Sequence, residues 1–304
     1  MIIDFHVHIF EETSGIRKFR DKIIEHRKNI LTPEQFANFR FDGKVESLIQ
    51  DMDEAGVDMA VCLAGDLAFM TQEEPEVSFL RNSEYVAESQ AKYPDRIIGF
   101  FGIDPFRPGA VQLLEKGIKE MGLKGVKLLP GWFYPNEERV IPFIQKIEEL
   151  GVPALFHTGT DPHPFLVKFG DPRYLDDLLL KFPNLKIIAA HWARGFESTL
   201  NQLLYFRPGR LWADLSGWQF EHLYSRWHFL QQMRYFLDRF PDAILMGTDW
   251  PLIRSAPHPT LKQWVEIIKN LELPQVCLDM GMKQFTEEEK NKILGVNAMK
   301  LLGL

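Results

Sequence analysis

The chain has 304 residues, a net charge of −7 at pH 7 and a pI of about 5.8. This acidic balance lacks the basic excess that binding to a phosphate backbone requires, so it argues against nucleic acid as a partner. The two cysteines, Cys62 and Cys277, are too few for a disulfide framework and too far apart in sequence to indicate a cysteine-based metal site. We therefore expect reduced thiols.

The N-terminus begins MIIDFHVHIF, with no basic residues before its short apolar run. No stretch of the chain reaches the roughly 18 apolar residues that are needed to span a bilayer. We expect a cytoplasmic protein without a membrane partner. Because 45% of the residues are hydrophobic, the chain can form one large core, and we predict a single domain over residues 1–304.

Short apolar runs recur along the chain, and segments of helical periodicity follow them. Strands that are buried on both faces beneath crossover helices have this pattern. The apolar runs are Ile2–His6, Val57–Ala64, Ile97–Ile103, Gly125–Leu129, Ala154–His157, Lys186–His191, Leu211–Ser216 and Ala243–Asp249. The helical segments are Val45–Ala55, Glu76–Tyr93, Ala110–Met121, Glu138–Leu150, Pro172–Phe182, Glu197–Phe206, His222–Phe240 and Leu261–Leu271. The alternation predicts an α/β protein with a (β/α)8 TIM barrel.

Two additions to the barrel are predicted. The connection after the first strand, residues 9–43, is much longer than an ordinary βα loop and contains helical patches at Gly15–Asn29 and Pro33–Phe39. We interpret this long insertion as a lid. Near the other end of the chain, Thr286–Leu302 predicts an extra C-terminal helix that begins with a Thr-Glu-Glu-Glu cap.

Five residues with metal-ligand side chains fall at the ends of predicted strands. His6 and His8 are two residues apart, so both face the barrel interior. Such a pair is weak evidence alone, because nine histidines produce one by chance in roughly one chain in four. His157, His191 and Asp249 each close a different strand and should meet the pair at one mouth. Imidazole and carboxylate ligands suit Zn²⁺ and its first-row neighbours, so the set predicts a catalytic metal centre.

The phrases DFHVH, GVKLLP, AHWARG and GTDWP, together with the histidines and the aspartate at the strand ends, resemble the amidohydrolase superfamily over nearly the whole chain. The phrases are similar to its amidohydrolase-related (amidohydrolase 2) branch of metal-dependent hydrolases and decarboxylases. The resemblance implies His6, His8 and Asp249 as primary metal ligands. It also implies that His157 and His191 bind the metal, a second metal or the substrate. One divalent ion is favoured over two, with Zn²⁺ expected first and Mn²⁺ as the alternative.

Lys127 lies on the fourth predicted strand, where some members of this superfamily carry a carbamylated lysine that bridges two metals. As an unmodified cation, Lys127 would instead pair with the substrate or with a carboxylate such as Asp249. Both interpretations stay open, with the unmodified cation favoured. Asp4 precedes the histidine pair, and we expect it to be structural or to orient an imidazole.

Residues that follow the strand ends are candidates for substrate binding. Arg194 and Arg254 could clamp a substrate carboxylate, although a solvated loop arginine is the more common case. His163, in a DPHP loop, could reach the substrate or brace the turn. Trp132 and Trp250 could line a pocket for an apolar or aromatic substrate or simply cap the barrel layers.

These residues predict a metal-dependent hydrolase that cleaves a small-molecule amide, ester or lactone. The metal would activate water, Asp249 would shuttle its proton, and His191 or Lys127 would stabilise the oxyanion. The alternative is a nonoxidative decarboxylase of an aromatic or related carboxylic acid, in which Asp249 protonates the ring. A TatD-like nuclease is a remote alternative, since such proteins usually carry Glu on the fourth strand. A catalytically silent barrel stays open, as does a homodimer.

Overall fold

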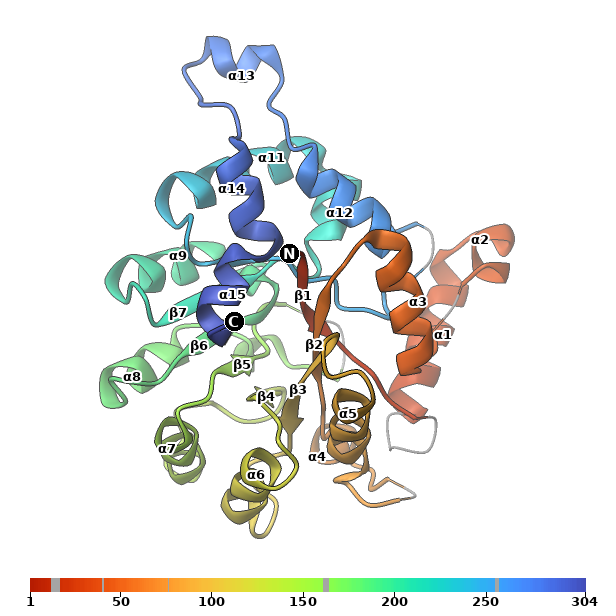
Figure 1. The fold of residues 1–304 in the computed structure, drawn as a ribbon, viewed down its shortest axis with the longest axis vertical. Helices are drawn as coiled ribbons and strands as arrows, with labels where there is room; N and C mark the ends of the chain where they lie inside the picture. The colour runs from red at the N-terminus through yellow and green to blue at the C-terminus, as the bar shows by residue number, and fades with distance from the viewer. Residues whose placement is uncertain (12–16, 40, 76, 161–163, 255–256) are drawn as a thin grey trace.

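The computed structural model describes residues 1–11, 17–39, 41–75, 77–160, 164–254 and 257–304. Eight parallel strands pair in sequence order around a barrel (Figure 1). They are β1 (Ile3–Val7), β2 (Met59–Leu63), β3 (Ile97–Gly102), β4 (Gly125–Leu128), β5 (Ala154–Phe156), β6 (Ile187–Ala189), β7 (Leu211–Asp214) and β8 (Ile244–Leu245). The chain around β8 closes the ring, because Phe5 N donates to Met246 O and Asp249 N donates to His6 O, each over 2.8 Å. The predicted α/β barrel is confirmed.

Helices surround the barrel (Figure 1). They are α3 (Val45–Ala55), α4 (Ala68–Thr71), α5 (Arg81–Lys92), α6 (Ala110–Lys119), α7 (Ile141–Leu150), α8 (Tyr174–Lys181), α9 (Glu197–Phe206), α10 (Trp218–Tyr224), α11 (Arg226–Arg239), α12 (Leu261–Lys269) and α13 (Gln275–Asp279). The predicted helix His222–Phe240 is split at Ser225, which leaves helical geometry with φ −150° and ψ 69°. The predicted helix Glu76–Tyr93 begins only at Arg81. Just before it, the Ser78 hydroxyl accepts from Leu80 N, a local bond that competes with helix formation.

The barrel interior is filled with apolar side chains below the carboxyl ends of the strands. Those from the strands are Ile3, Phe5, Val61, Leu63, Ile98, Phe100, Leu155, Ile188 and Leu245. Ala298 and Leu301 of α15 (Asn297–Leu302) pack into the same cluster, so the C-terminal helix closes the base of the barrel. The outer layer is equally tight. A Cβ at Gly117 of α6 would lie 2.4 Å from the Phe101 ring.

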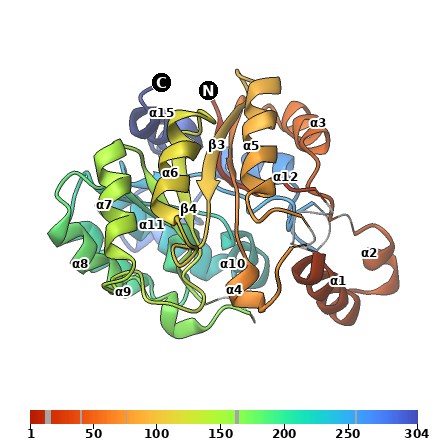
Figure 2. The same cartoon turned by 90° about the horizontal axis from the view of Figure 1, so that it is seen from below.

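The two predicted additions are present. The insertion after β1 forms α1 (Arg17–Ile30) and α2 (Pro33–Ala37), and a capping box between Thr32 and Gln35 begins the second. Thr286 caps α14 (Glu287–Asn291), which continues through a π-helical turn (Lys292–Val296) into α15. Figure 2 shows the two termini and α15 at one end of the barrel, whereas α1 and α4 lie toward the other. None of the described helices is both long enough and apolar enough to cross a membrane.

Candidate metal centre

A bulge in β1 shapes the start of the site. Asp4 pairs with Ala60 of β2, and the next pair joins Val7 to Cys62, so three steps of β1 match two steps of β2. Because of this shift, both Phe5 and the next residue, His6, face the barrel interior.

Asp4 fastens β1 to the chain after β8. Its carboxylate accepts from Thr248 N over 3.1 Å, from the Thr248 hydroxyl, and from the backbone N of His6 over 3.2 Å. Burial raises the pKa of the Asp4 carboxyl to about 7, although these hydrogen bonds oppose the shift. Asp4 therefore contacts the backbone of His6 and is not bonded to its ring.

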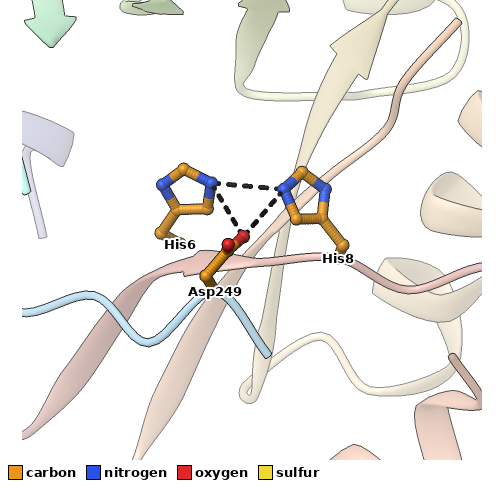
Figure 3. A group of neighbouring side chains, drawn as sticks. All are labelled: His6, His8 and Asp249. Carbon is orange, nitrogen blue, oxygen red and sulfur yellow. Dashed lines mark hydrogen bonds and ion pairs between the residues drawn. The ribbon is translucent and has the colours of Figure 1, made fainter. Parts of the chain in front are cut away.

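Three predicted ligands meet at the carboxyl end of the barrel (Figure 3). His6 Nε2 lies 3.2 Å from His8 Nε2. Asp249 Oδ1 lies 3.5 Å from His6 Nε2 and 3.4 Å from His8 Nε2. The His6 side chain is fully buried, whereas those of His8 and Asp249 are 27% and 17% exposed. The three atoms form a compact triangle, in which the corners from His8 and Asp249 belong to side chains that are partly exposed to solvent.

The hydrogen-bond partners of the two rings show what this triangle suits. His6 Nδ1 lies 2.9 Å from a carboxylate oxygen of Asp214, and His8 Nδ1 lies 3.2 Å from the carbonyl oxygen of Leu63. Both partners only accept hydrogen bonds, so each Nδ1 carries the hydrogen and each Nε2 carries a lone pair. Two lone pairs and a carboxylate oxygen therefore converge, which is the donor set of a divalent metal site.

Buried neutral imidazoles fit the same role. Burial, together with the positive charge of Lys127, lowers the pKa of His6 to about 3. The pKa of His157 is also lowered, by its burial and by the charges of His191 and Lys127. The His191 ring centroid lies 4.9 Å from that of His6 and 5.1 Å from that of His157. The structure thus brings together the five ligand-type residues that the strand ends predict.

Asp214 is a site residue that the sequence analysis missed. It is fully buried at the end of β7 and orients His6 through Nδ1. Burial alone would raise the pKa of Asp214, but the adjacent His6 imidazole, which is hydrogen-bonded to it, holds that pKa below the usual range. Gly247 leaves room for the pair, since a Cβ there would lie 3.1 Å from both Asp214 Oδ1 and His6 Cβ. The available signal was position, because Asp214 lies two residues before the end of the predicted strand Leu211–Ser216.

Backbone strain gathers around two of these residues. His191, Trp192 and Ala193 have φ values of 59°, 45° and 45°, and Asp249 has φ 61°. Left-handed geometry costs on the order of 1–3 kcal/mol for each non-glycine residue, and it concentrates at functional sites. The indole of Trp218 donates to His191 O over 2.8 Å and helps to hold this turn.

Lys127 also reaches the centre. It is 1% exposed, and its ammonium lies 3.4 Å from His6 Nε2. The centre opens into a small cavity of about 90 Å³. The cavity is lined by His6, His8, Phe10, Phe41, Gly65, Leu67, Asn82, Lys127, Leu129, His157, Phe165, His191, Asp249, Pro251 and Leu252. Among these described lining residues, Lys127 is the one lysine or arginine, and most of those that are not ligand-type residues are apolar.

The structure does not bring the predicted aromatic residues to this cavity. The Trp132 indole donates to Asp104 over 2.7 Å, away from the cavity lining. Trp250 is fully buried, and its indole donates to Asp51 of α3 over 2.8 Å. Both rings therefore serve the packing around the mouth, as the alternative interpretation expected. His163 lies outside the described residues.

The two predicted arginine clamps also have protein partners. Arg194 donates to Gly217 O over 3.3 Å and lies over the Phe220 ring. Arg254 pairs with Asp51 over 2.9 Å and also with Asp42. Neither side chain lines the cavity. Their roles in substrate binding stay predictions that the described contacts do not favour.

The inserted helices are tied to the mouth by a different arginine. Arg27 of α1 is 6% exposed, and its Nη1 lies 2.7 Å from His258 Nε2 in the connection after β8. Both residues pack against Phe220, with a ring-to-ring distance of 4.3 Å for His258. The contact fastens the insertion to the mouth of the barrel, which is the position that a lid requires.

A family model described as amidohydrolase matches residues 3–304. A 2-amino-3-carboxymuconate-6-semialdehyde decarboxylase from Dictyostelium discoideum is 23% identical over 300 residues, covering 84% of this chain and 76% of that protein.

Two solved structures share the fold over nearly their full lengths. A dihydroxybenzoic acid decarboxylase from Polaromonas sp. JS666, with bound manganese and the inhibitor 2-nitroresorcinol, has a TM-score of 0.66 at 18% identity and covers 100% of this chain and 97% of its own. A probable 2-pyrone-4,6-dicarboxylic acid hydrolase from Acinetobacter baumannii has a TM-score of 0.64 at 19% identity and covers 100% and 99%. At these identities the likeness concerns the fold alone.

Proposed function

Because the chain belongs to the amidohydrolase family, we propose that it is a metal-dependent decarboxylase that acts on an aromatic or related conjugated carboxylic acid. The curated relative from Dictyostelium and the Polaromonas neighbour are both decarboxylases, which supports this reaction ahead of the hydrolysis that we expected first. The observation that carries the proposal is the lining of the cavity, which places a cluster of metal-ligand side chains against mostly apolar walls.

The lining suits loss of carbon dioxide. A carboxylate carries a localised charge, whereas the carbon dioxide that leaves is neutral, so a site that replaces water with apolar side chains favours the change. Phe10, Phe41 and Phe165 offer flat surfaces for a conjugated substrate. Lys127 supplies positive charge beside the ligands, as an acidic substrate requires.

His6, His8 and Asp249 would hold the metal. Zn²⁺ is the ion expected from the ligand types, and the manganese of the Polaromonas enzyme supports Mn²⁺ as the alternative. A bound divalent ion would neutralise and orient the oxygen atoms of the substrate. His157 and His191 are close enough to act as further ligands or to contact the substrate.

Asp249 is the proposed proton carrier. Burial alone would raise the pKa of Asp249, but the neighbouring imidazoles of His8, His6 and His191 hold it below the usual range. A carboxylate with a low pKa is ionised at neutral pH, so Asp249 would first take a proton from water. Once protonated it is a strong acid, as transfer of that proton to a ring carbon requires. The bond from that carbon to the carboxylate then breaks, and its electron pair restores the conjugated system. Carbon dioxide leaves, and the proton takes its place.

Hydrolysis is the second candidate. The neighbour from Acinetobacter, a probable hydrolase of a dicarboxylic acid, shares the fold over the whole chain. The same ligands could hold a metal beside a lactone, and Asp249 could accept a proton from the attacking water.

Isotopes separate the two reactions. The metal-loaded protein would be incubated with a panel of hydroxybenzoates, conjugated carboxymuconate-type acids and lactones, in D2O and separately in H2¹⁸O. Decarboxylation predicts release of carbon dioxide and one deuterium at the carbon that lost it, with no ¹⁸O in the product. Incorporation of ¹⁸O without release of carbon dioxide would overturn the proposal in favour of hydrolysis.

We propose one metal ion per chain, an unmodified Lys127, a small-molecule substrate and a cytoplasmic location. Elemental analysis and intact mass spectrometry check the first two, because a carbamate adds mass to the lysine. Sedimentation of the purified chain tests whether it forms the homodimer that the sequence analysis left open.

A further inference from the structure

One buried hydroxyl joins the two histidines that flank the centre. Ser216, directly beyond β7, is fully buried. Its Oγ lies 2.7 Å from His191 Nδ1 and 3.0 Å from His6 Nδ1, and it donates to Asp214 Oδ1. The carbonyl oxygen of the same serine lies 3.2 Å from His191 Nδ1.

These contacts determine where the hydrogens lie. Asp214 Oδ1 also accepts from Ser216 N over 2.9 Å and from His191 N over 3.2 Å, so it acts as an ionised acceptor. The serine hydroxyl has one hydrogen, and the carboxylate receives it, which leaves two lone pairs on Oγ. Those lone pairs can accept from both imidazoles only if each Nδ1 carries a hydrogen.

The opposite tautomer of His191 conflicts with the same contacts. A bare Nδ1 would face the carbonyl oxygen of Ser216 over 3.2 Å, with a lone pair on each atom. The hydroxyl would then have to turn from Asp214 toward the ring, and the carboxylate would lose the hydrogen bond that Oγ donates to it. The arrangement is consistent only with Nδ1–H on both rings.

We propose that Ser216 is a positioning residue that, with Asp214, fixes His6 and His191 in the same tautomer. Both rings then present an Nε2 lone pair at the centre, so a single hydroxyl prepares the metal ligand and the second imidazole together. The inference rests on the metal-binding part of the proposed function and is independent of which reaction follows. It goes beyond the orientation of His6 by Asp214, because it assigns the state of His191 to a different side chain.

Ser83 provides a matched control. It is also fully buried, and its hydroxyl bonds to O and N of Gly102, at 3.0 and 3.2 Å, next to another strand. Ser83→Ala removes the same atoms as Ser216→Ala from an equally buried position without touching an imidazole. Any effect of losing a buried hydroxyl on general packing should therefore appear in both variants.

The test reads tautomers in the metal-free protein. Histidines labelled with ¹⁵N would be observed by NMR at about pH 8, and the signals of His6 and His191 assigned with His6→Gln and His191→Gln. The wild type should show Nδ1–H on both rings. In Ser216→Ala, His191 keeps the backbone carbonyl oxygen of residue 216 as an acceptor for Nδ1–H but loses the hydroxyl, so a measurable fraction of His191 should shift to Nε2–H, whereas His6 keeps Nδ1–H through Asp214. Ser216→Thr should restore the wild-type pattern, and Ser83→Ala should leave it unchanged.

Metal affinity gives a second readout, measured by competition with a chelator. Ser216→Ala should bind Zn²⁺ about 10-fold more weakly than the wild type, with Ser216→Thr close to wild type. If Ser216→Ala does not fold, Ser216→Cys keeps the volume with a much weaker donor and should show the same changes in smaller degree. Unchanged tautomers in the Ala or Cys variant, or equal changes in Ser83→Ala, would overturn the inference. If the tautomers respond as expected but the wild type takes up no metal, the proposed function fails and the role of Ser216 stands.

Discussion

The two ends of the barrel are built from the same strands but bury opposite kinds of side chain. At the base, Ile3 and Phe100 pack with Leu301 of the C-terminal helix in an apolar cluster. At the mouth, His6 and Asp214 are fully buried on strands that are apolar farther down. Burying polar groups is unfavourable unless each finds a partner, and those at the mouth are satisfied mainly by one another.

Because of this difference, the base of the barrel mainly stabilises the fold, whereas the mouth carries the groups for metal binding and catalysis. The base contributes free energy of folding through apolar burial, and its side chains carry no groups that could bind a metal. The mouth contains the left-handed residues His191 and Asp249, which lower stability while they aim ligands at one point. Substitutions at the two ends should therefore affect different measurements.

The largest effect is expected from loss of a primary ligand. His6→Ala and Asp249→Asn should lower catalytic efficiency by about 10³-fold or more and abolish stoichiometric metal, because each removes one of the three primary ligands. Elemental analysis and kinetics check this expectation. His26→Ala, at an exposed histidine of α1, is the control and should behave as the wild type. A His6→Ala protein that keeps both metal and activity would contradict the assignment.

A substitution at the base of the barrel should lower the free energy of unfolding and leave the metal content unchanged. Phe100 is fully buried and meets Phe5 edge-on at 5.9 Å. Phe100→Ala should reduce the free energy of unfolding by about 3–5 kcal/mol through lost burial and a cavity. Urea unfolding measures the loss, and metal content at a temperature where the variant stays folded should remain one ion per chain. Loss of the metal from a folded variant would show that the two ends are not independent.

Replacing Asp214 should weaken the centre without emptying it. Asp214→Asn keeps the shape of the side chain but removes the charge that orients His6 through Nδ1. Metal affinity should fall by about 10- to 100-fold. Calorimetric titration of the metal-free protein measures this change. An affinity equal to that of the wild type would mean that Asp214 serves the fold and not the ligand.

A smaller effect concerns pH and the insertion that contacts the mouth. Burial and the charge of Arg27 lower the pKa of His258 from 6.5 to about 3. The unfolded chain therefore takes up a proton on His258 below about pH 6.5, whereas the folded protein does not until about pH 3. The stability that neutral His258 gives is present above pH 6.5 and is lost as the pH falls through this window.

The matched variant is His258→Gln, whose amide oxygen can still accept from Arg27. On lowering the pH from 7 to 4, the wild type should lose on the order of 2 kcal/mol more stability than the variant. Denaturant unfolding at several pH values checks this. Parallel pH profiles for the two proteins would show that His258 is not held neutral by its surroundings.

The sequence predicted what depends on pattern. Alternating apolar runs and helical segments predicted the barrel, and strand-end positions predicted His6, His157 and Asp249 as neighbours, because the carboxyl ends of parallel strands meet at one mouth. Asp214 lies two residues before the end of its predicted strand and no motif drew attention to it, so this rule did not select it.

Other features depend on local geometry that leaves no trace in a single sequence. The β1 bulge follows from the register against β2. The left-handed turn at residues 191–193 contains no glycine, which is the residue that would have predicted a positive φ. Trp132 and Trp250 lie beyond strand ends, where turns decide the direction of a side chain. Their indoles point to Asp104 and Asp51, so proximity in sequence to the mouth did not place them in the cavity.

Anomalous scattering from a crystal of the protein loaded with Mn²⁺ would locate the metal directly. We expect one peak in each chain, about 2.0–2.3 Å from His6 Nε2, His8 Nε2 and an oxygen of Asp249. His6, His191 and Asp214 form a second group of ligand-type atoms, on the Nδ1 side of His6. The Nδ1 atoms there carry hydrogens that are donated in hydrogen bonds, so we expect no metal at this group. A peak at that second group, or no peak at the barrel mouth, would contradict the account.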